Sequence, residues 1–267
     1  MCIRDRYKVD DLTTFLDVVF VAIVAISCLF APDYLEPRGL PIAEFAAIII
    51  FALCGAMLVA ASADLLVLFL GLELMVIPGY LLAGYHKRDA LSTEGAILQM
   101  VNHGLITGAL FLLVGVIYER THDRTIAKMG GLGAVTPVYS AALGFFVFAS
   151  IGLPGLAGFV GEFLVFQGAF AFNPWVGVSV TFVMILAASY LLWMIQRVCF
   201  GQVSEFLAGL GHHLTDMRPT EILTLAPLGA LTVVLGLYPG LVLDLIAGPV
   251  KAVLAAVDPA VAMSIGR

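Results

Sequence analysis

Two carboxylates stand inside long apolar stretches, where a charge is costly and a chemical role is the natural expectation. Glu73 lies in an otherwise uncharged run, and Glu162 follows a glycine-rich segment in a later run. A charged side chain deep in a bilayer costs several kcal/mol unless it is paired, hydrated or protonated. Acids in such places can take up and release protons, so both are candidate proton carriers. The alternative is structural, with Glu73 bonded to a neighbouring helix and Glu162 at the edge of a packing face.

A third apolar run carries polar side chains along one side. Gln99, His103 and Thr107 are spaced by four residues, so on a helix they share one face. Because the pKa of histidine is about 6.5 in water, this stripe predicts a proton relay. A core histidine whose hydrogen bonds are satisfied by its neighbours is the alternative.

Glycine and proline before Glu162 predict an interruption of its helix. The predicted break residues are Pro154, Gly155, Gly158 and Gly161. The pattern is not a phosphate-binding loop, because no strand precedes it and no Lys-Ser/Thr pair follows. Non-helical backbone at membrane depth occurs where protein or a water-filled cavity surrounds it, often beside ionisable groups. Pro78, shortly after Glu73, is expected to bend its helix as well.

The composition indicates which elements must hold these residues. Hydrophobic residues make up 61% of the 267 positions and charged residues 12%, whereas soluble domains carry about 25% charged residues. Runs of about 20 apolar residues are long enough to cross a bilayer as helices. We therefore predict an all-α, polytopic transmembrane bundle without strands. Its eight membrane segments are 12–31, 43–62, 64–85, 95–118, 137–153, 156–173, 175–200 and 220–238.

The remaining stretches are expected to lie at the membrane surface or in turns. Residues 202–219 mix charged and apolar positions and predict a surface helix and connector, and 240–257 predict an amphipathic interfacial tail. The turn at 62–64 is very short, and Asp64 is well placed to cap the next helix. The cysteines form no CxxC pair and are expected to be small buried hydrophobes rather than metal ligands.

These residues resemble the antiporter-like membrane subunits of respiratory NADH–quinone oxidoreductase (complex I), which share their fold with multisubunit cation/proton antiporters. Residues 8–94 are similar to subunit N through the strings VDDL at 9–12, ASADLL at 61–66 and LFLGLEL at 68–74. Residues 95–257 are similar to the C-terminal half of subunit M through EGAILQMVNHGL at 94–105, YERTH at 118–122, GLPG at 152–155, GFVGEF at 158–163 and LGLYP at 235–239. Residues 1–7 form a prefix that differs in character from the rest of the chain, and 258–267 form a tail.

The resemblance implies that Glu73 and Glu162 serve two half-channels for protons, and that His103 and His122 belong to the hydrated axis or its edge. In the family the first of these glutamates pairs with a lysine two helices further on. No lysine lies within a predicted membrane segment here, and the family's central helices are missing. We therefore expect a fused or shortened chain, in which a lysine partner for Glu73 would come from another chain.

The resemblance implies a proton-translocating membrane subunit of a redox-driven enzyme, which couples quinone reduction to proton pumping. The alternatives are a subunit of a Na+/H+ antiporter complex and a truncated or fused fragment that does not pump. No dinucleotide fingerprint, CxxC cluster or haem ligand pair occurs, so NADH, FMN, Fe–S clusters and quinone are expected in partner subunits. The expected partners are other complex I membrane subunits and the lipid of the inner (cytoplasmic) membrane, which the chain crosses several times. No basic cluster suggests nucleic acid.

Overall fold

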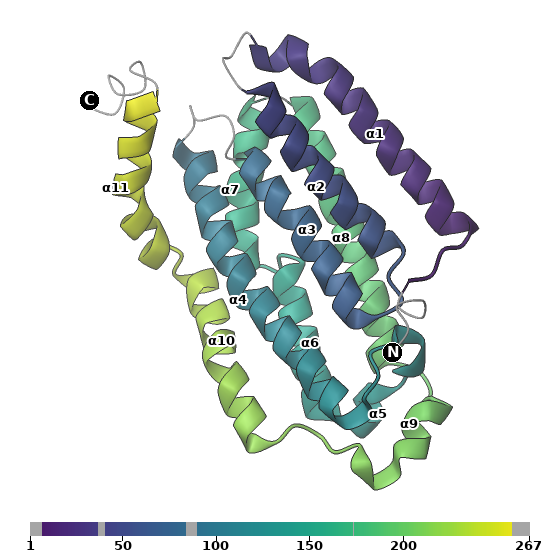
Figure 1. The fold of residues 1–267 in the computed structure, drawn as a ribbon. Coiled ribbons are helices and arrows are strands. Elements are labelled where there is room, and N and C mark those ends of the chain that lie inside the picture. The colour runs from purple at the N-terminus through teal and green to yellow at the C-terminus, as the bar shows by residue number, and fades with distance from the viewer. Residues whose placement is uncertain (1–6, 37–40, 84–89, 173, 258–267) are drawn as a thin grey trace. The chain divides into compact units, whose positions relative to one another are not determined.

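The computed structural model describes residues 7–36, 41–83, 90–172 and 174–257 (Figure 1). In these ranges the protein is all-helical and has no β-strand, only an isolated bridge between Tyr7 and Ser62. In the described residues each predicted membrane segment contains a helix, which confirms the all-α class. Of the described helices, four are long and apolar enough to cross a membrane, namely those over Asp11–Leu29, Ile42–Ala60, Thr93–Thr121 and Pro219–Leu237. The number of crossings therefore stays a prediction.

In its described residues the N-terminal unit, Met1–Leu82, holds three helices. They are α1 (Asp11–Leu35), α2 (Ile42–Ala60) and α3 (Leu65–Ala83). Helices α2 and α3 are joined by a turn at 61–64 and pack closely through glycines. A Cβ on Gly55 would lie 2.6 Å from the backbone carbon of Leu74, and one on Gly71 would lie 2.9 Å from the backbone nitrogen of Val59. These glycines therefore let the two backbones approach.

Asp64 caps α3, as the sequence predicted. Its Oδ1 accepts a hydrogen bond from the backbone N–H of Leu66 at 2.8 Å, and its backbone oxygen accepts from Leu68 N–H at 2.9 Å. An aspartate at this position satisfies a donor that the first turn of a helix leaves open. Helix α3 itself continues through Pro78. Pro78 therefore does not interrupt the helix, because a proline costs one backbone bond and neighbouring structure can hold the helix together, and the expected bend stays a prediction.

The C-terminal unit, Ala83–Arg267, contains the remaining elements. In chain order they are α4 (Ala90–Thr121), η3 (Ile126–Lys128), α5 (Leu132–Val135), α6 (Pro137–Ser150), α7 (Ala157–Phe172), α8 (Pro174–Cys199), α9 (Glu205–Leu210), η4 (Gly211–His213), α10 (Pro219–Leu237) and α11 (Gly240–Val257). The 202–219 segment thus contains α9 and η4, and the predicted tail is the helix α11.

Helix α4 is the centre of this unit. It packs against α6, α7, α10 and α11, and α7 packs in turn against α8 and α10 (Figure 1). Leu98, Leu113 and Ile117 of α4 are fully buried, as is Leu143 of α6. Any polar side chain that α4 directs into this packing is therefore surrounded by protein.

The segment after α4 is held by a compact set of bonds around Asp123. Its Oδ1 accepts hydrogen bonds from the Thr125 N–H at 2.9 Å and the Thr125 hydroxyl at 2.6 Å, and its Oδ2 pairs with Lys128 Nζ at 2.5 Å. Partial burial would raise the pKa of Asp123, but the hydrogen bonds from Lys128 and Thr125 outweigh it and lower the pKa to about 2.

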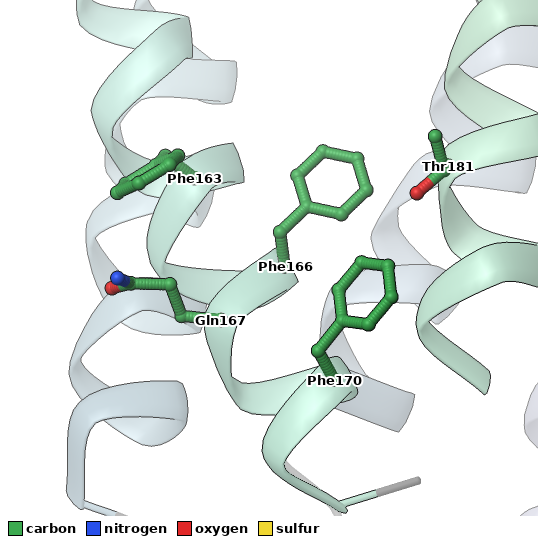
Figure 2. A pocket seen from close by; sticks show the side chains of 5 residues that line it. All are labelled: Phe163, Phe166, Gln167, Phe170 and Thr181. Atoms are coloured by element: carbon green, nitrogen blue, oxygen red, sulfur yellow. The ribbon is translucent and has the colours of Figure 1, made fainter. Parts of the chain in front are cut away.

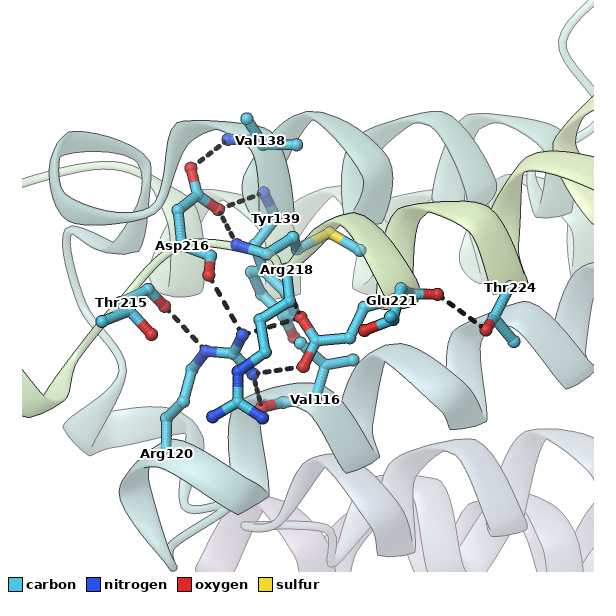
Figure 3. A network of polar contacts seen from close by, with 11 residues as sticks. Val116, Arg120, Val138, Tyr139, Thr215, Asp216, Arg218, Glu221 and Thr224 are labelled. Atoms are coloured by element: carbon cyan, nitrogen blue, oxygen red, sulfur yellow. Dashed lines mark hydrogen bonds and ion pairs between the residues drawn. The ribbon is translucent and has the colours of Figure 1, made fainter.

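A buried arginine joins the end of α4 to the start of α10 (Figure 3). The Arg120 guanidinium donates to both carboxylate oxygens of Glu221, at 3.0 and 2.7 Å, and the two side chains are 5% and 14% exposed. It also donates to the backbone oxygens of Thr215, Val116 and Asp216 at 2.7, 2.8 and 3.0 Å. We call this group the Arg120 clamp. Planar bidentate pairing of this kind fixes geometry as well as charge.

The same connector caps a third helix. Asp216 Oδ2 accepts from Val138 N–H at 2.8 Å and its Oδ1 accepts from Tyr139 N–H at 3.0 Å, both in the first turn of α6 (Figure 3). Thr136, at the helix N-cap position, makes no side-chain capping bond. Asp216 therefore supplies from a distant part of the chain the acceptor that α6 lacks locally.

Candidate functional site

The structure brings Glu162 and Gln99 together between α7 and α4. Gln99 Nε2 donates a hydrogen bond to Glu162 Oε1 at 3.3 Å. Gln99 is 3% exposed, and the Oε2 atom of Glu162 is covered by protein and accepts no hydrogen bond. The carboxyl group therefore lies inside the helix packing rather than at its surface.

Two glycines allow this approach. A Cβ on Gly161 would lie 2.9 Å from the Gln99 Cα, and one on Gly95 would lie 2.5 Å from the Leu164 Cβ. Small residues at facing positions let transmembrane helices pack backbone to backbone. The short distance between α4 and α7 follows from these two positions, and it brings the amide within reach of the carboxylate.

The helical path is interrupted directly before α7. Helix α6 ends at Ser150 and α7 begins at Ala157, and Gly152 and Gly155 between them have φ angles of 83° and 93°. Residues other than glycine rarely adopt this left-handed backbone. The break thus contains Pro154 and Gly155 of the predicted break residues.

Gly158 and Gly161 lie inside α7 and do not belong to the break. A Cβ on Gly158 would lie 3.3 Å from the backbone carbon of Ala149, in the last turn of α6. The two glycines therefore serve close packing, Gly158 against α6 and Gly161 against α4. The interpretation of all the glycines as break residues was wrong for these two, because a helix tolerates glycine where a neighbouring backbone needs the space.

Gly152 makes room for the carboxyl group of Glu162. A Cβ built on Gly152 would lie 3.2 Å from the Glu162 Cδ and would overlap Oε2. The break therefore does two things at once: it turns the chain between α6 and α7, and it leaves a side-chain-free surface against which the carboxylate rests. Gly152 was not among the predicted break residues, although its place at the head of the GLPG string was a signal.

The polar stripe on α4 is buried along its length. Asn102 is fully buried, and His103 and Thr107 are 9% and 8% exposed. Asn102 Nδ2 donates to the backbone oxygen of Ala157 at 2.7 Å, which ties α4 to the first residue of α7. The Thr107 hydroxyl donates to the His103 backbone oxygen at 2.6 Å. His103 lies one turn from Gln99 along α4, a rise of about 6 Å, and we group Glu162, Gln99 and His103 as one cluster.

Of the other two proton-transfer candidates, Glu73 belongs to the N-terminal unit and His122 lies outside this cluster. Glu73 is half-buried in α3 of the N-terminal unit. His122 is exposed, follows the end of α4 with φ of 50°, and packs edge-on against Tyr118 with ring centroids 5.8 Å apart. Nineteen residues separate it from His103, roughly 28 Å along a helix axis. The structure therefore does not bring His122 to the buried carboxylate.

An apolar pocket lies between α7 and α8 (Figure 2). It has a volume of about 600 Å³ and is lined by Phe163, Phe166, Gln167, Phe170 and Thr181. Phe163 stacks on Phe159 with ring centroids 5.7 Å apart. None of the lining side chains is ionisable, so this pocket is not a proton-carrying site.

Sequence reasoning also missed the Arg120 clamp and Asp216. Arg120 was not singled out from the sequence, although it is only 9% exposed in the structure. The signal was available in principle, because Arg120 ends one apolar segment and Glu221 begins another. Their pairing across the fold is a tertiary property.

Comparisons with known proteins place this arrangement in context. Residues 89–188 match the family model described as the transmembrane region of NADH:quinone oxidoreductase and the Mrp antiporter. The chain is 48% identical over 172 residues to "NADH-quinone oxidoreductase subunit M" of Rhodobacter capsulatus, covering 64% of this chain and 33% of the relative. It is 40% identical over 220 residues to the protein of that name in Pseudomonas aeruginosa, covering 79% of this chain and 41% of the relative.

Solved structures give the same picture. A chain of "Respiratory complex I from Thermus thermophilus with bound NADH" matches with a TM-score of 0.67 and 28% identity, over 86% of this chain and 49% of that one. A chain of the Mrp complex from Dietzia sp. DQ12-45-1b matches with a TM-score of 0.57 and 20% identity, over 93% of this chain and 52% of that one, and shows a shared fold. The chain spans less than half the length of the two curated relatives.

Proposed function

From its similarity to the antiporter-like membrane subunits of complex I, we propose that this chain is a proton-translocating membrane subunit of NADH–quinone oxidoreductase. The observation that supports the proposal is the Glu162 carboxyl group, held between the Gln99 amide and Gly152 in the interior of the C-terminal unit. A carboxyl group in such a place can exist as the neutral acid and as the anion, and thus can carry a proton.

The proposed transfer runs between Glu162 and His103. Glu162 binds a proton as the carboxylic acid, and the Gln99 amide orients one oxygen through its N–H. His103, one turn along α4, receives or supplies the proton through a ring nitrogen. Gln99 and His103 are one helical turn apart, a rise of about 6 Å, and a bridging water molecule is proposed to complete the path between the Glu162 carboxyl group and the His103 ring. Gln99 is thus a positioning residue, because an amide holds no exchangeable charge at neutral pH.

The driving force is proposed to come from partner subunits. The electron carriers are proposed to bind to those partner subunits, and this chain is proposed to supply no redox group. These carriers are NADH, FMN, Fe–S clusters and quinone. The assembly is proposed to lie in the inner (cytoplasmic) membrane of a bacterium, with this chain crossing it about eight times. Glu73 is proposed to serve a second half-channel with a lysine from another chain, in line with the division into an N-like part (8–94) and an M-like part (95–257).

The test is proton pumping by the assembled complex in membrane vesicles, with the pH gradient followed by a fluorescent amine after NADH is added. Glu162→Gln is expected to lower the number of protons moved per NADH oxidised, because glutamine keeps the shape and loses the titratable group. Glu205→Gln is the matched control, since Glu205 is an exposed acid on α9. Unchanged pumping in Glu162→Gln would remove Glu162 as a carrier and favour the non-pumping alternative.

The antiporter alternative has its own outcome in the same vesicles. If the complex were a Na+/H+ antiporter, added Na+ would collapse an imposed pH gradient without any NADH. The similarity to the Mrp complex supports a common fold, and a common fold does not tell NADH-driven pumping from Na+-driven antiport. The Na+ addition distinguishes these two reactions.

A further inference from the structure

Helix α10 rests directly on the break before α7. A Cβ built on Gly236, one residue before the end of α10, would lie 2.5 Å from the backbone carbon of Leu156 and 2.6 Å from its Cα, and it would overlap the backbone oxygen of Gly155. These are main-chain atoms, which cannot rotate aside as a side chain could. The glycine therefore sets how closely the end of α10 seats on the break.

The other end of α10 is fixed to α4. Glu221, in its first turn, is held by the Arg120 clamp, and its Oε2 also accepts the Arg218 backbone N–H at 2.7 Å (Figure 3). Both charged side chains are largely shielded from solvent. Pairs of this kind are costly to break from one side, because the remaining charge stays buried. The start of α10 is thus pinned.

Between these ends α10 is a helix of 19 residues with Pro227 inside it, about 28 Å long. Thr232 and Leu235 are buried on its inner side. Because both ends are held by contacts, we expect a displacement at one end of α10 to reach the other end. It lies against both α4 and α7, the two helices that carry Gln99 and Glu162.

We propose that α10 is a strut that positions the Glu162 carboxyl group, with Gly236 as the positioning residue at its seat. Gly236 contacts the backbone of Gly155 and Leu156, which belong to the turn between α6 and α7. Gly152 is the first glycine of that turn, and the Glu162 carboxyl group packs against it. The inference deepens the proposed function, since it concerns the residue that carries the proton there. It makes no statement about the direction or ion of transport.

The test measures the carboxyl group itself rather than pumping. Dicyclohexylcarbodiimide enters membranes and adds to protonated buried carboxyl groups, and the stable adduct at Glu162 is counted by mass spectrometry of the peptide that contains it. The rate is measured against pH for the full chain in its complex. Glu162→Gln, which cannot react, identifies the signal.

Gly236→Ala is expected to change the labelling rate of Glu162 several-fold and to shift the pH at which that rate is half-maximal. Gly229→Ala is the matched control on the same helix, because a Cβ there would lie 3.7 Å from Phe145 and Phe146, in ordinary contact. Its rate should stay within about twofold of the wild type, as for a distant independent site. Equal pH profiles for both variants would overturn the proposal.

A second variant covers the case in which Gly236→Ala does not fold. Glu221→Gln loosens the pinned end without touching the break, and it should shift the same pH profile in a complex that still assembles. An unchanged profile in Glu221→Gln overturns the strut. In Gly236→Ala or Glu221→Gln, loss of pumping without any change in the labelling rate of Glu162 or its pH profile would count against the strut alone. Normal pumping in Glu162→Gln would count against the proposed function alone.

Discussion

Truncating Arg120 to alanine should destabilise the C-terminal unit more than most single changes. The substitution leaves the Glu221 carboxylate, 14% exposed, without its cation, and it removes the donor shared by the backbone oxygens of Thr215, Val116 and Asp216. Breaking a buried pair from one side costs about 3–5 kcal/mol. Counting two charge-assisted bonds at about 1.5–3 kcal/mol each gives a similar range.

That loss converts into a measurable change in melting temperature. For a chain of this size each kcal/mol lowers the midpoint by about 2–4 °C, so Arg120→Ala should melt roughly 6–20 °C below the wild type. The double variant Arg120→Met with Glu221→Leu removes both charges together. It should lose less than the single variants Arg120→Met and Glu221→Leu summed, by about 0.5–3 kcal/mol, the size of a direct coupling.

A buried thiol provides the assay. Cys199, at the end of α8, is 6% exposed, whereas Cys28 is half-buried and Cys54 is exposed. With the other cysteines replaced by alanine, a thiol-reactive dye reports the opening of the packing around Cys199 as detergent-solubilised protein is heated. All variants are compared at one heating rate, because unfolding of such proteins is often irreversible.

Two results would refute the reasoning. An Arg120→Ala variant that melts within about 2 °C of the wild type would mean that water or lipid headgroups replace the clamp at no cost. Strict additivity in the double variant would mean that the two side chains do not interact in solution, whatever their geometry.

Three further changes test neighbouring features. Asp216→Ala should cost about 0.5–2 kcal/mol through the lost cap of α6, seen as a lower melting temperature. Gly152→Ala and Gly155→Ala should both destabilise, since both have positive φ, and carbodiimide labelling of Glu162 should change more in Gly152→Ala, where the added methyl group meets the carboxyl group directly. The pKa of Asp123 is lowered to about 2, so its hydrogen bonds should stabilise the fold above pH about 4, and this stabilisation should fade as pH falls through about 2. Melting temperatures measured against pH should show the loss, which is worth at most about 1 kcal/mol. Asp123→Asn should abolish this pH dependence.

The helices could be predicted from sequence because bilayer crossing imposes a length and an apolar composition that are visible residue by residue. Glu162 and Gln99 could be singled out for the same reason: a polar side chain in an apolar run is conspicuous. Their contact could not be derived, because it joins positions 63 residues apart and depends on how α4 packs on α7.

The glycines show where local reasoning fails. A helix break and a close helix contact both select glycine, and only backbone dihedrals or neighbours separate the two uses. Gly155 has positive φ, while Gly161 is helical and faces Gln99. The Arg120 clamp was missed for a related reason: a charge at the end of an apolar segment looks the same whether it faces water or another helix.

The cap that Asp216 places on α6 has a consequence for synthesis of the chain. Ribosomes deliver α4 and α6 long before residue 216, so the first-turn N–H groups of Val138 and Tyr139 and the guanidinium of Arg120 meet their acceptors late. Until residues 215–221 emerge, these donors must be shared with water or lipid headgroups. The contacts at this end of the C-terminal unit therefore form late in its biogenesis. A ribosome stalled before residue 215 would leave the earlier helices inserted in the membrane without these contacts.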